Sequence, residues 1–215
     1  MDLAIAANAE LVKKSRLGVG LITKHLHPRS SARQAHREEQ IKTPSRSWVG
    51  SEIVLDKNDC IPHISLAMGC VNRGDIARIS GLLQPLAASA PKNLRMVGIQ
   101  KSTSFSGEIV SVLQVERATP LQKLHEEICE MVRPFFAYDA VENMVAGGRA
   151  GQTTLQWIKD YPAKSSYDSF SPHITVGYGD LPDRVLPVDF AVSRLAICHL
   201  GNHCTCAKVL WSMEI

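Results

Sequence analysis

The chain has 215 residues, of which 45% are hydrophobic and 21% are charged, and its formal net charge is +3. A chain of this length can bury a sizeable core as one domain or as two closely packed lobes. The small positive charge argues against extended coating of nucleic acid but does not oppose a phosphate-bearing ligand. No apolar run approaches the roughly 18–20 residues that a membrane span needs, and the first residues lack the basic region of a secretory signal. We therefore expect a cytoplasmic protein without a membrane anchor.

Six cysteines are scattered along a chain that is large enough to fold without covalent cross-links. They are Cys60, Cys70, Cys129, Cys198, Cys204 and Cys206. This distribution favours reduced thiols over a disulfide framework. We expect Cys204 and Cys206 to share one face of the last strand as small apolar residues.

The first 47 residues are interpreted as an N-terminal extension, and residues 48–215 as the folded body. Residues 2–14 are rich in alanine and predict a helix, which Gly18 and Gly20 are expected to break. Residues 21–42 are basic and polar with little apolar periodicity, which favours a surface helix or a mobile arm. An arm of this kind is either a solvated extension or a segment that contacts RNA.

The body is expected to alternate strands with three helices. Strands are predicted at 48–55, 61–68, 94–101, 108–116, 172–176, 188–200 and 205–214, and helices at 76–86, 119–133 and 152–161. Thr119 is the expected cap of the second helix, with Pro120 at its first position. His125 stands among charged neighbours in that helix, so we interpret it as a histidine on the surface or the flank of the helix.

Two short stretches of nearly the same sequence dominate the body. Pro62-His63-Ile64-Ser65-Leu66 recurs 110 positions later as Pro172-His173-Ile174-Thr175-Val176. Both are rich in β-branched and aliphatic residues and are soon followed by glycine, which is typical of a strand that ends in a turn. Side chains of a strand alternate between its faces, so each motif presents its histidine and its hydroxyl on one face and its aliphatics on the other.

This set of side chains suits phosphoryl chemistry. An imidazole with a pKa near 6.5 can act as acid or base at neutral pH. Hydrolysis of a cyclic phosphodiester needs one group that takes a proton from water and one that gives a proton to the departing ribose oxygen. The two hydroxyls can donate hydrogen bonds to the non-bridging oxygens, where negative charge is concentrated in the transition state.

The paired motifs resemble those of the 2H phosphoesterase superfamily, which includes the 2′-5′ RNA ligase-like proteins and the RNA 2′,3′-cyclic phosphodiesterases. The resemblance covers about residues 48–215. It departs from the usual pattern at Ser65, where threonine is more common, and in the long segment that precedes the first motif. The resemblance implies that His63 and His173 are the catalytic pair and that Ser65 and Thr175 bind the phosphate.

The same resemblance implies an α+β fold of two pseudo-symmetric lobes, each an antiparallel sheet with outer helices, around a central cleft. It also implies a monomeric, metal-independent phosphodiesterase without a cofactor, acting on a 2′,3′-cyclic phosphate or a 2′-5′ linkage at an RNA end or in a small nucleotide. Tyr167 and Phe170, which precede the second motif, are candidates for stacking on a base.

Two alternatives remain open at this point. One is a module of the same fold that binds RNA ends or nucleotides without turnover. The other is a metal site, because zinc favours the ligand types of four residues that lie close together in the sequence. These residues are His199, His203, Cys204 and Cys206.

Overall fold

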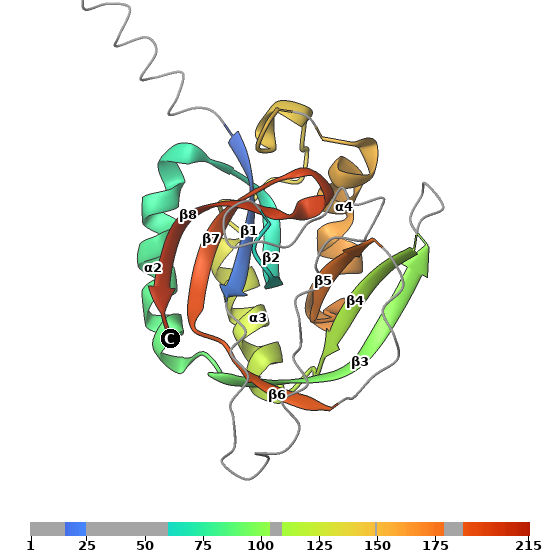
Figure 1. The fold of residues 1–215 in the computed structure, drawn as a ribbon. Coiled ribbons are helices and arrows are strands. Elements are labelled where there is room, and N and C mark those ends of the chain that lie inside the picture. The colour runs from blue at the N-terminus through green and yellow to red at the C-terminus, as the bar shows by residue number, and fades with distance from the viewer. Residues whose placement is uncertain (1–15, 25–59, 104–108, 149, 179–186) are drawn as a thin grey trace, which may run out of the picture.

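The computed structural model describes residues 16–24, 60–103, 109–148, 150–178 and 187–215 (Figure 1). Its strands are β1 (Arg16–Lys24), β2 (His63–Asn72), β3 (Asn93–Thr103), β4 (Ile109–Val115), β5 (His173–Tyr178), β6 (Val188–Ala191), β7 (Arg194–Leu200) and β8 (Cys206–Glu214). Its α-helices are α2 (Ile76–Ser89), α3 (Thr119–Val132) and α4 (Gln152–Lys164). Short 3-10 turns are η1 (Arg73–Asp75), η2 (Glu142–Met144), η3 (Tyr167–Ser169) and η4 (Asn202–Cys204).

The described strands form two antiparallel sheets of four strands each, in the orders β2-β1-β7-β8 and β5-β4-β3-β6. β2, which carries the first motif, stands at the end of the strand order of the first sheet. β5, which carries the second motif, stands at the end of the strand order of the second sheet. With three helices packed around these sheets, the α+β class expected from the sequence is confirmed.

Strand β1 corrects the interpretation of the N-terminal residues. It pairs with β2 on one side and with β7 on the other, so residues 16–24 belong to the body. The expected surface helix or mobile arm from residue 21 is therefore wrong for the part of β1 that it covers, residues 21–24. Two neighbouring strands supply its backbone hydrogen bonds, and this tertiary pairing overrides the weak local preference of glycine. The predicted helix at 2–14 and the predicted strand at 48–55 lie outside the described residues.

The predicted strand at 188–200 is also two strands rather than one. Its first part, β6, pairs with β3 in the second sheet, whereas its second part, β7, lies between β1 and β8 in the first. The chain changes sheets at Val192 and Ser193, where the Val192 N–H donates to the Lys92 carbonyl at 2.9 Å. A continuous apolar pattern does not reveal such a crossing, because both halves have the same preference for strand.

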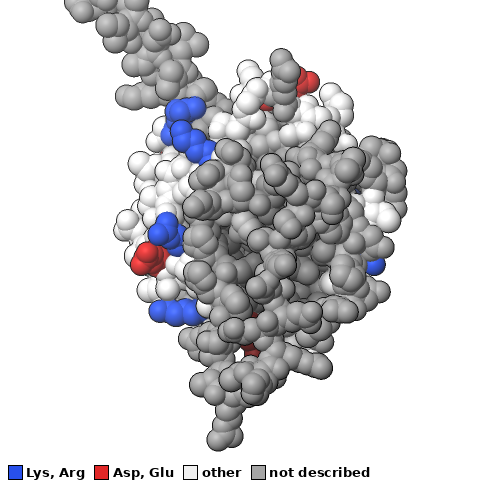
Figure 2. Space-filling model, in the orientation of Figure 1, with Lys and Arg blue, Asp and Glu red and all other residues white. Residues whose placement is uncertain are grey.

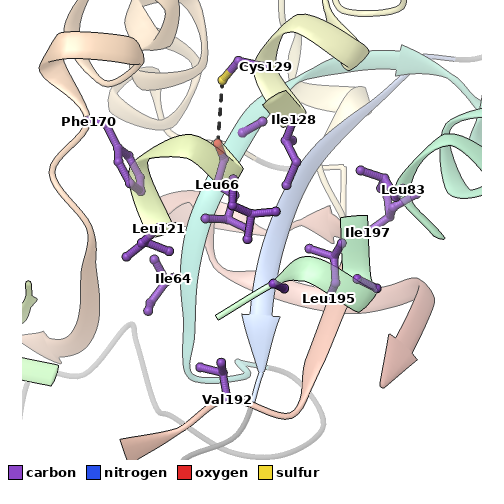
Figure 3. Close-up of a cluster of buried hydrophobic side chains, with 14 of the residues drawn as sticks. Ile64, Leu66, Leu83, Leu121, Ile128, Cys129, Phe170, Val192, Leu195 and Ile197 are labelled. Atoms are coloured by element: carbon purple, nitrogen blue, oxygen red, sulfur yellow. Dashed lines mark hydrogen bonds between the residues drawn. The ribbon is translucent and has the colours of Figure 1, made fainter. Parts of the chain in front are cut away.

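A single hydrophobic cluster contains residues of both sheets and of the helices α2 and α3 (Figure 3). Helix α3 packs on β2, and α2 packs on β7 and β8. The motif residues Ile64, Leu66 and Ile174 are buried in this cluster, as their alternation predicted. The strands that carry the two motifs are therefore attached to one common core.

A disulfide joins Cys198 to Cys206, which corrects the expectation that all the thiols are reduced. The two residues lie on the neighbouring strands β7 and β8, with their Cα atoms 5.6 Å apart, within the range that a disulfide spans. Antiparallel pairing creates this proximity, and cysteine spacing alone does not show it. Cys204 lies in η4, so the expected shared face with Cys206 on one strand is wrong.

On the face shown in Figure 2, the visible lysines and arginines of the described residues lie as separate groups along the left edge, with one further group at the right edge. Several of the described cations are paired with carboxylates, as Arg95 is with Asp189 and Arg194 with Glu214. Among the described helices, none is long and apolar enough to cross a membrane.

Candidate active site

The two motif histidines share one local geometry. His63 donates from Nδ1 to the carbonyl oxygen of Ile61 at 2.6 Å, and His173 donates from Nδ1 to the carbonyl oxygen of Ser171 at 2.8 Å. A carbonyl oxygen only accepts hydrogen bonds, so Nδ1 carries the hydrogen in both rings. In each motif Nε2 is thus the nitrogen that is left for a substrate.

The motif strands also share an irregularity just after their hydroxyl residue. In the pairing of β2 with β1, Ser65 and Ala67 face consecutive residues, so Leu66 is the extra residue. In the pairing of β5 with β4, Thr175 and Gly177 face consecutive residues, so Val176 is the extra residue. Such bulges are frequent beside active sites because they change the direction of a strand and its side chains.

The structure corrects one prediction about the second motif. Strict alternation predicts that Val176 points into the core, but its side chain is only half-buried, whereas Ile174 is fully buried. The bulge alone does not account for this exposure, because Leu66, the extra residue of the matching bulge in β2, is fully buried.

The structure brings the two motifs together. Strands β2 and β5 belong to different sheets but contact each other, and they lie side by side in Figure 1. Burial lowers the pKa of His63, the hydrogen bond to Ile61 opposes this shift, and the charge of His173 lowers the pKa further. The two imidazoles therefore interact electrostatically, although His63 is half-buried and His173 is exposed.

Further polar side chains, which the sequence did not single out, lie next to the second motif on the second sheet. Gln114 is the direct cross-strand neighbour of His173, and its side-chain amide donates to Oε1 of Gln100 at 3.1 Å. Thr175 faces Val112, which in turn faces Gln100 on β3. Alternation along three strands could have suggested this polar row, but only after the register between the strands was known.

The two aromatic candidates for base stacking differ in their surroundings. Phe170 is only 3% exposed and packs in the main hydrophobic cluster, where it stacks on the His125 ring. This burial corrects the interpretation of Phe170, because neither face of a core ring is free for a base. Tyr167 is 37% exposed and donates its hydroxyl to Glu130, so stacking on a base stays a prediction for this ring alone.

His125 is the clearest correction among the candidate residues. The charged neighbours of His125 favoured a surface position, but its side chain is fully buried. It follows Leu121 by four positions and precedes Ile128 by three, and both of those residues are buried on the same face of α3. This helical spacing was the signal that could have placed His125 inside.

The proposed metal ligands have other partners. Cys206 is in the disulfide, and His199 donates from Nε2 to the Met144 carbonyl oxygen at 3.0 Å. Asn202 donates its side-chain amide to Nε2 of His203 at 3.0 Å. Within the described ranges, no group of three or more potential ligands is arranged to hold a metal ion.

A separate surface depression of about 500 Å³ lies beside η2 and α4. Its described lining residues are Val141, Glu142, Asn143, Gly148 and Leu155. None of the four motif residues is among these, so this depression is distinct from the paired histidines.

Comparisons with known proteins give one family match and several similar solved structures. The sequence profile of the 2′-5′ RNA ligase superfamily matches residues 56–200, a range that contains both motifs. The comparison with curated proteins found no match. The crystal structure of TT0787 of Thermus thermophilus is similar in fold, with a TM-score of 0.51, 18% identity and coverage of 92% of this chain and 97% of that one.

Two further solved structures are less similar. The crystal structure of E. coli LigT in apo form has a TM-score of 0.43 and 14% identity, covering 94% of this chain and 98% of that one. A crystal structure of a phosphoesterase has a TM-score of 0.43 and 13% identity, covering 93% and 98%.

Proposed function

Because this chain belongs to the 2′-5′ RNA ligase superfamily, we propose that it is a metal-independent phosphodiesterase acting on RNA ends or small nucleotides. The proposed reaction is hydrolysis of a 2′,3′-cyclic phosphate or of a 2′-5′ phosphodiester. The observation that carries the proposal is the matched pair of imidazoles. Each is bonded through Nδ1 to its own backbone, and the two lie on contacting strands with Nε2 left for substrate.

Burial favours different roles for the two rings. His63 is half-buried with a lowered pKa, so it is neutral at neutral pH and suited to act as the base. The exposed His173 is then the acid. In the proposed step water attacks phosphorus, His63 Nε2 takes a proton from that water, and the bond from phosphorus to the ribose oxygen breaks. His173 Nε2–H gives its proton to that oxygen, so one proton is taken up and one is released.

The hydroxyls complete the site. Ser65 and Thr175 are both half-buried and follow their histidines by two positions, which places each on the same strand face as its imidazole. We assign them as donors to the non-bridging phosphate oxygens, which gain negative charge as the reaction proceeds. In this proposal the two sheets act as two lobes, and the phosphate binds in a cleft between β2 and β5.

The test is hydrolysis of 2′,3′-cyclic nucleotides by the purified protein in EDTA, with product formation and nucleotide binding measured in parallel. Turnover that does not change on chelation is expected. Binding without turnover would instead favour the non-catalytic module. Loss of turnover in EDTA with recovery on adding zinc would refute the metal-independent mechanism.

A further inference from the structure

His125 lies between the two segments that carry the motifs. It is fully buried near the middle of α3, the helix that packs on β2. On its other side lie η3 and Phe170, and the second motif begins two residues after Phe170. Cys129, one turn further along α3, directs its thiol at the Leu66 carbonyl oxygen of β2 (Figure 3).

Three contacts connect the His125 ring to both segments. Nδ1 lies 2.7 Å from the carbonyl oxygen of Leu66, the residue that follows Ser65 in the first motif. The backbone N–H of Tyr167 donates to Nε2 at 2.8 Å. The ring also stacks on Phe170, with centroids 3.9 Å apart and an angle of 3° between the planes.

These partners define the protonation state of the ring. The Leu66 carbonyl only accepts, so Nδ1 carries a hydrogen, and the Tyr167 amide only donates, so Nε2 offers its lone pair. His125 must therefore be neutral for both bonds to exist. If Nε2 were protonated, it would become a donor facing the donor N–H of Tyr167. The hydrogen bond between His125 and η3 would then be lost.

The surroundings favour the neutral form. Burial lowers the pKa of His125, while the hydrogen bond to Leu66 and the charge of Glu126 raise it and the charge of Arg117 lowers it. The Cys129 thiol and the Tyr167 phenol, each with its pKa raised to about 12, are uncharged around neutral pH. The Tyr167 phenol also donates to the Glu130 carboxylate on the outer side of α3.

Two further side chains hold η3, one from α3 and one from the residues just before it. Gln122 donates to the Tyr167 carbonyl oxygen at 3.1 Å, and Arg117 donates to the Asp168 carbonyl oxygen at 2.6 Å. Tyr167 has a φ of 52°, a left-handed conformation that a residue with a bulky side chain rarely adopts. Such a conformation persists where the surrounding contacts hold it.

We propose that His125 is a positioning residue that joins β2 to the segment before β5 and thereby sets the placement of His63 relative to His173. This inference rests on the function proposed above. Proton transfer depends on the distance between each imidazole and the phosphate. A misplacement of about 1 Å caused by a remote change can cost roughly 100-fold in rate.

The experiment compares His125→Asn with His125→Gln and with Ile128→Val. Asparagine can keep a donor near the position of Nδ1 but has no acceptor near Nε2, whereas glutamine can place an acceptor near Nε2. Ile128 is equally buried on α3, so its truncation controls for lost core packing. Each protein is measured for kcat and KM on a 2′,3′-cyclic nucleotide, for thermal midpoint, and for hydrogen exchange of the Tyr167 amide.

For His125→Asn we expect kcat to fall by about 10–100-fold with little change in KM, together with faster exchange of the Tyr167 amide. His125→Gln should recover part of both losses. Ile128→Val should lower the thermal midpoint and leave kcat and the Tyr167 exchange near wild type. A wild-type kcat in folded His125→Asn, or an equal loss of kcat in Ile128→Val, would overturn the positioning role.

A titration of the wild-type protein tests the link without any assay of activity. Nitrogen NMR of the His125 ring should show an unprotonated Nε2 at pH 8. On acidification, protonation of this nitrogen should accompany faster exchange of the Tyr167 amide, after correction for the intrinsic rate. If the exchange rate of the Tyr167 amide does not change when His125 is protonated, the inference is overturned. Absence of turnover by the wild-type protein, with the two events still coupled, refutes only the proposed reaction.

Discussion

The motif histidines are oriented by their own backbone. In each motif a proline stands between the histidine and the carbonyl that accepts its Nδ1–H, at Pro62 and at Pro172. The ring of proline fixes φ near −65° and so limits where that carbonyl lies. A carboxylate often orients the base in hydrolases. Here the backbone carbonyl two residues before each histidine takes the place of such a carboxylate and restrains the orientation of the imidazole.

Replacing either motif histidine should remove most of the hydrolysis. His63→Ala and His173→Ala should each lower kcat by ~10²–10⁴-fold, the usual contribution of a proton-transfer partner. Ser65→Ala and Thr175→Ala should cost less, because each removes one of several donors to the phosphate. His203→Ala, in η4, is the control and should hydrolyse at the wild-type rate. Near-full activity in either motif variant contradicts the assigned roles.

Two histidines make the stability of the fold depend on pH. Burial lowers the folded-state pKa of both His63 and His125, so the unfolded chain binds more protons near its ordinary pKa of about 6.5. The contribution of these two histidines to the free energy of unfolding should therefore be complete above about pH 6.5. It should decrease as the pH falls towards their folded-state pKa values, and then level off.

Urea unfolding at a series of pH values checks this expectation. In folded His125→Asn the decrease on acidification should be smaller than in the wild type, because one of the two titrating groups is absent. A wild-type free energy of unfolding that is unchanged between pH 7.5 and pH 5 contradicts the assignment of buried neutral rings.

At the scale of elements, the motif strands are irregular in the same way. The extra residue follows the hydroxyl in both, at Leu66 in β2 and at Val176 in β5. Two strands from different sheets thus repeat the Nδ1 hydrogen bond, the hydroxyl two residues later and the register shift. This shared geometry extends the sequence similarity of the motifs to their backbones and supports equivalent roles for the two strands.

Two glycines should respond in opposite ways to alanine. A Cβ at Gly69 on β2 would lie 2.5 Å from the Phe136 ring, so Gly69→Ala should destabilise the fold by about 1–3 kcal/mol through overpacking. Nothing lies within 4 Å of a Cβ at Gly81 in α2, so Gly81→Ala should stabilise it by about 0.4–1 kcal/mol. Denaturant midpoints measure both. A stabilised Gly69→Ala variant would show that β2 and Phe136 are not in close contact.

At the scale of the whole molecule, the two motifs depend on one core. Ile64 and Leu66 from β2 and Ile174 from β5 belong to the same buried cluster. Because the interior is close-packed, we expect a change in side-chain volume at one motif to alter the packing around the other. In the proposal above, this packing and the hydrogen bonds of His125 together set the distance between the imidazoles.

The two imidazoles should titrate as a pair in catalysis. Only the form with one neutral and one protonated ring is productive, so kcat/KM should follow a bell-shaped dependence on pH, with limbs that belong to the coupled pair. The rate should therefore fall on both the acid and the alkaline side of its maximum. A rate that rises to a plateau on the alkaline side would exclude an essential protonated imidazole.

The sequence by itself determined the motifs and most of the regular elements. The alternation of Ile64 and Leu66 predicted their burial, and the helices α2, α3 and α4 follow apolar spacing and lie within a few residues of their predicted positions. Their boundaries were less certain. Thr119 was expected to cap α3, but the helix includes it, and its cap position is occupied by Ala118 without a side-chain bond. Local patterns identify such elements because they depend on neighbours in the chain.

Only the tertiary structure decided the contacts between distant segments. The pairing of β1 with two strands, the crossing from β6 to β7 and the burial of His125 each depend on residues far apart in the sequence. A histidine among charges favours the surface until a carbonyl of β2 and an amide of η3 satisfy both of its nitrogens. The reason is physical, since the cost of burying a polar group depends on partners that only the folded chain brings within reach.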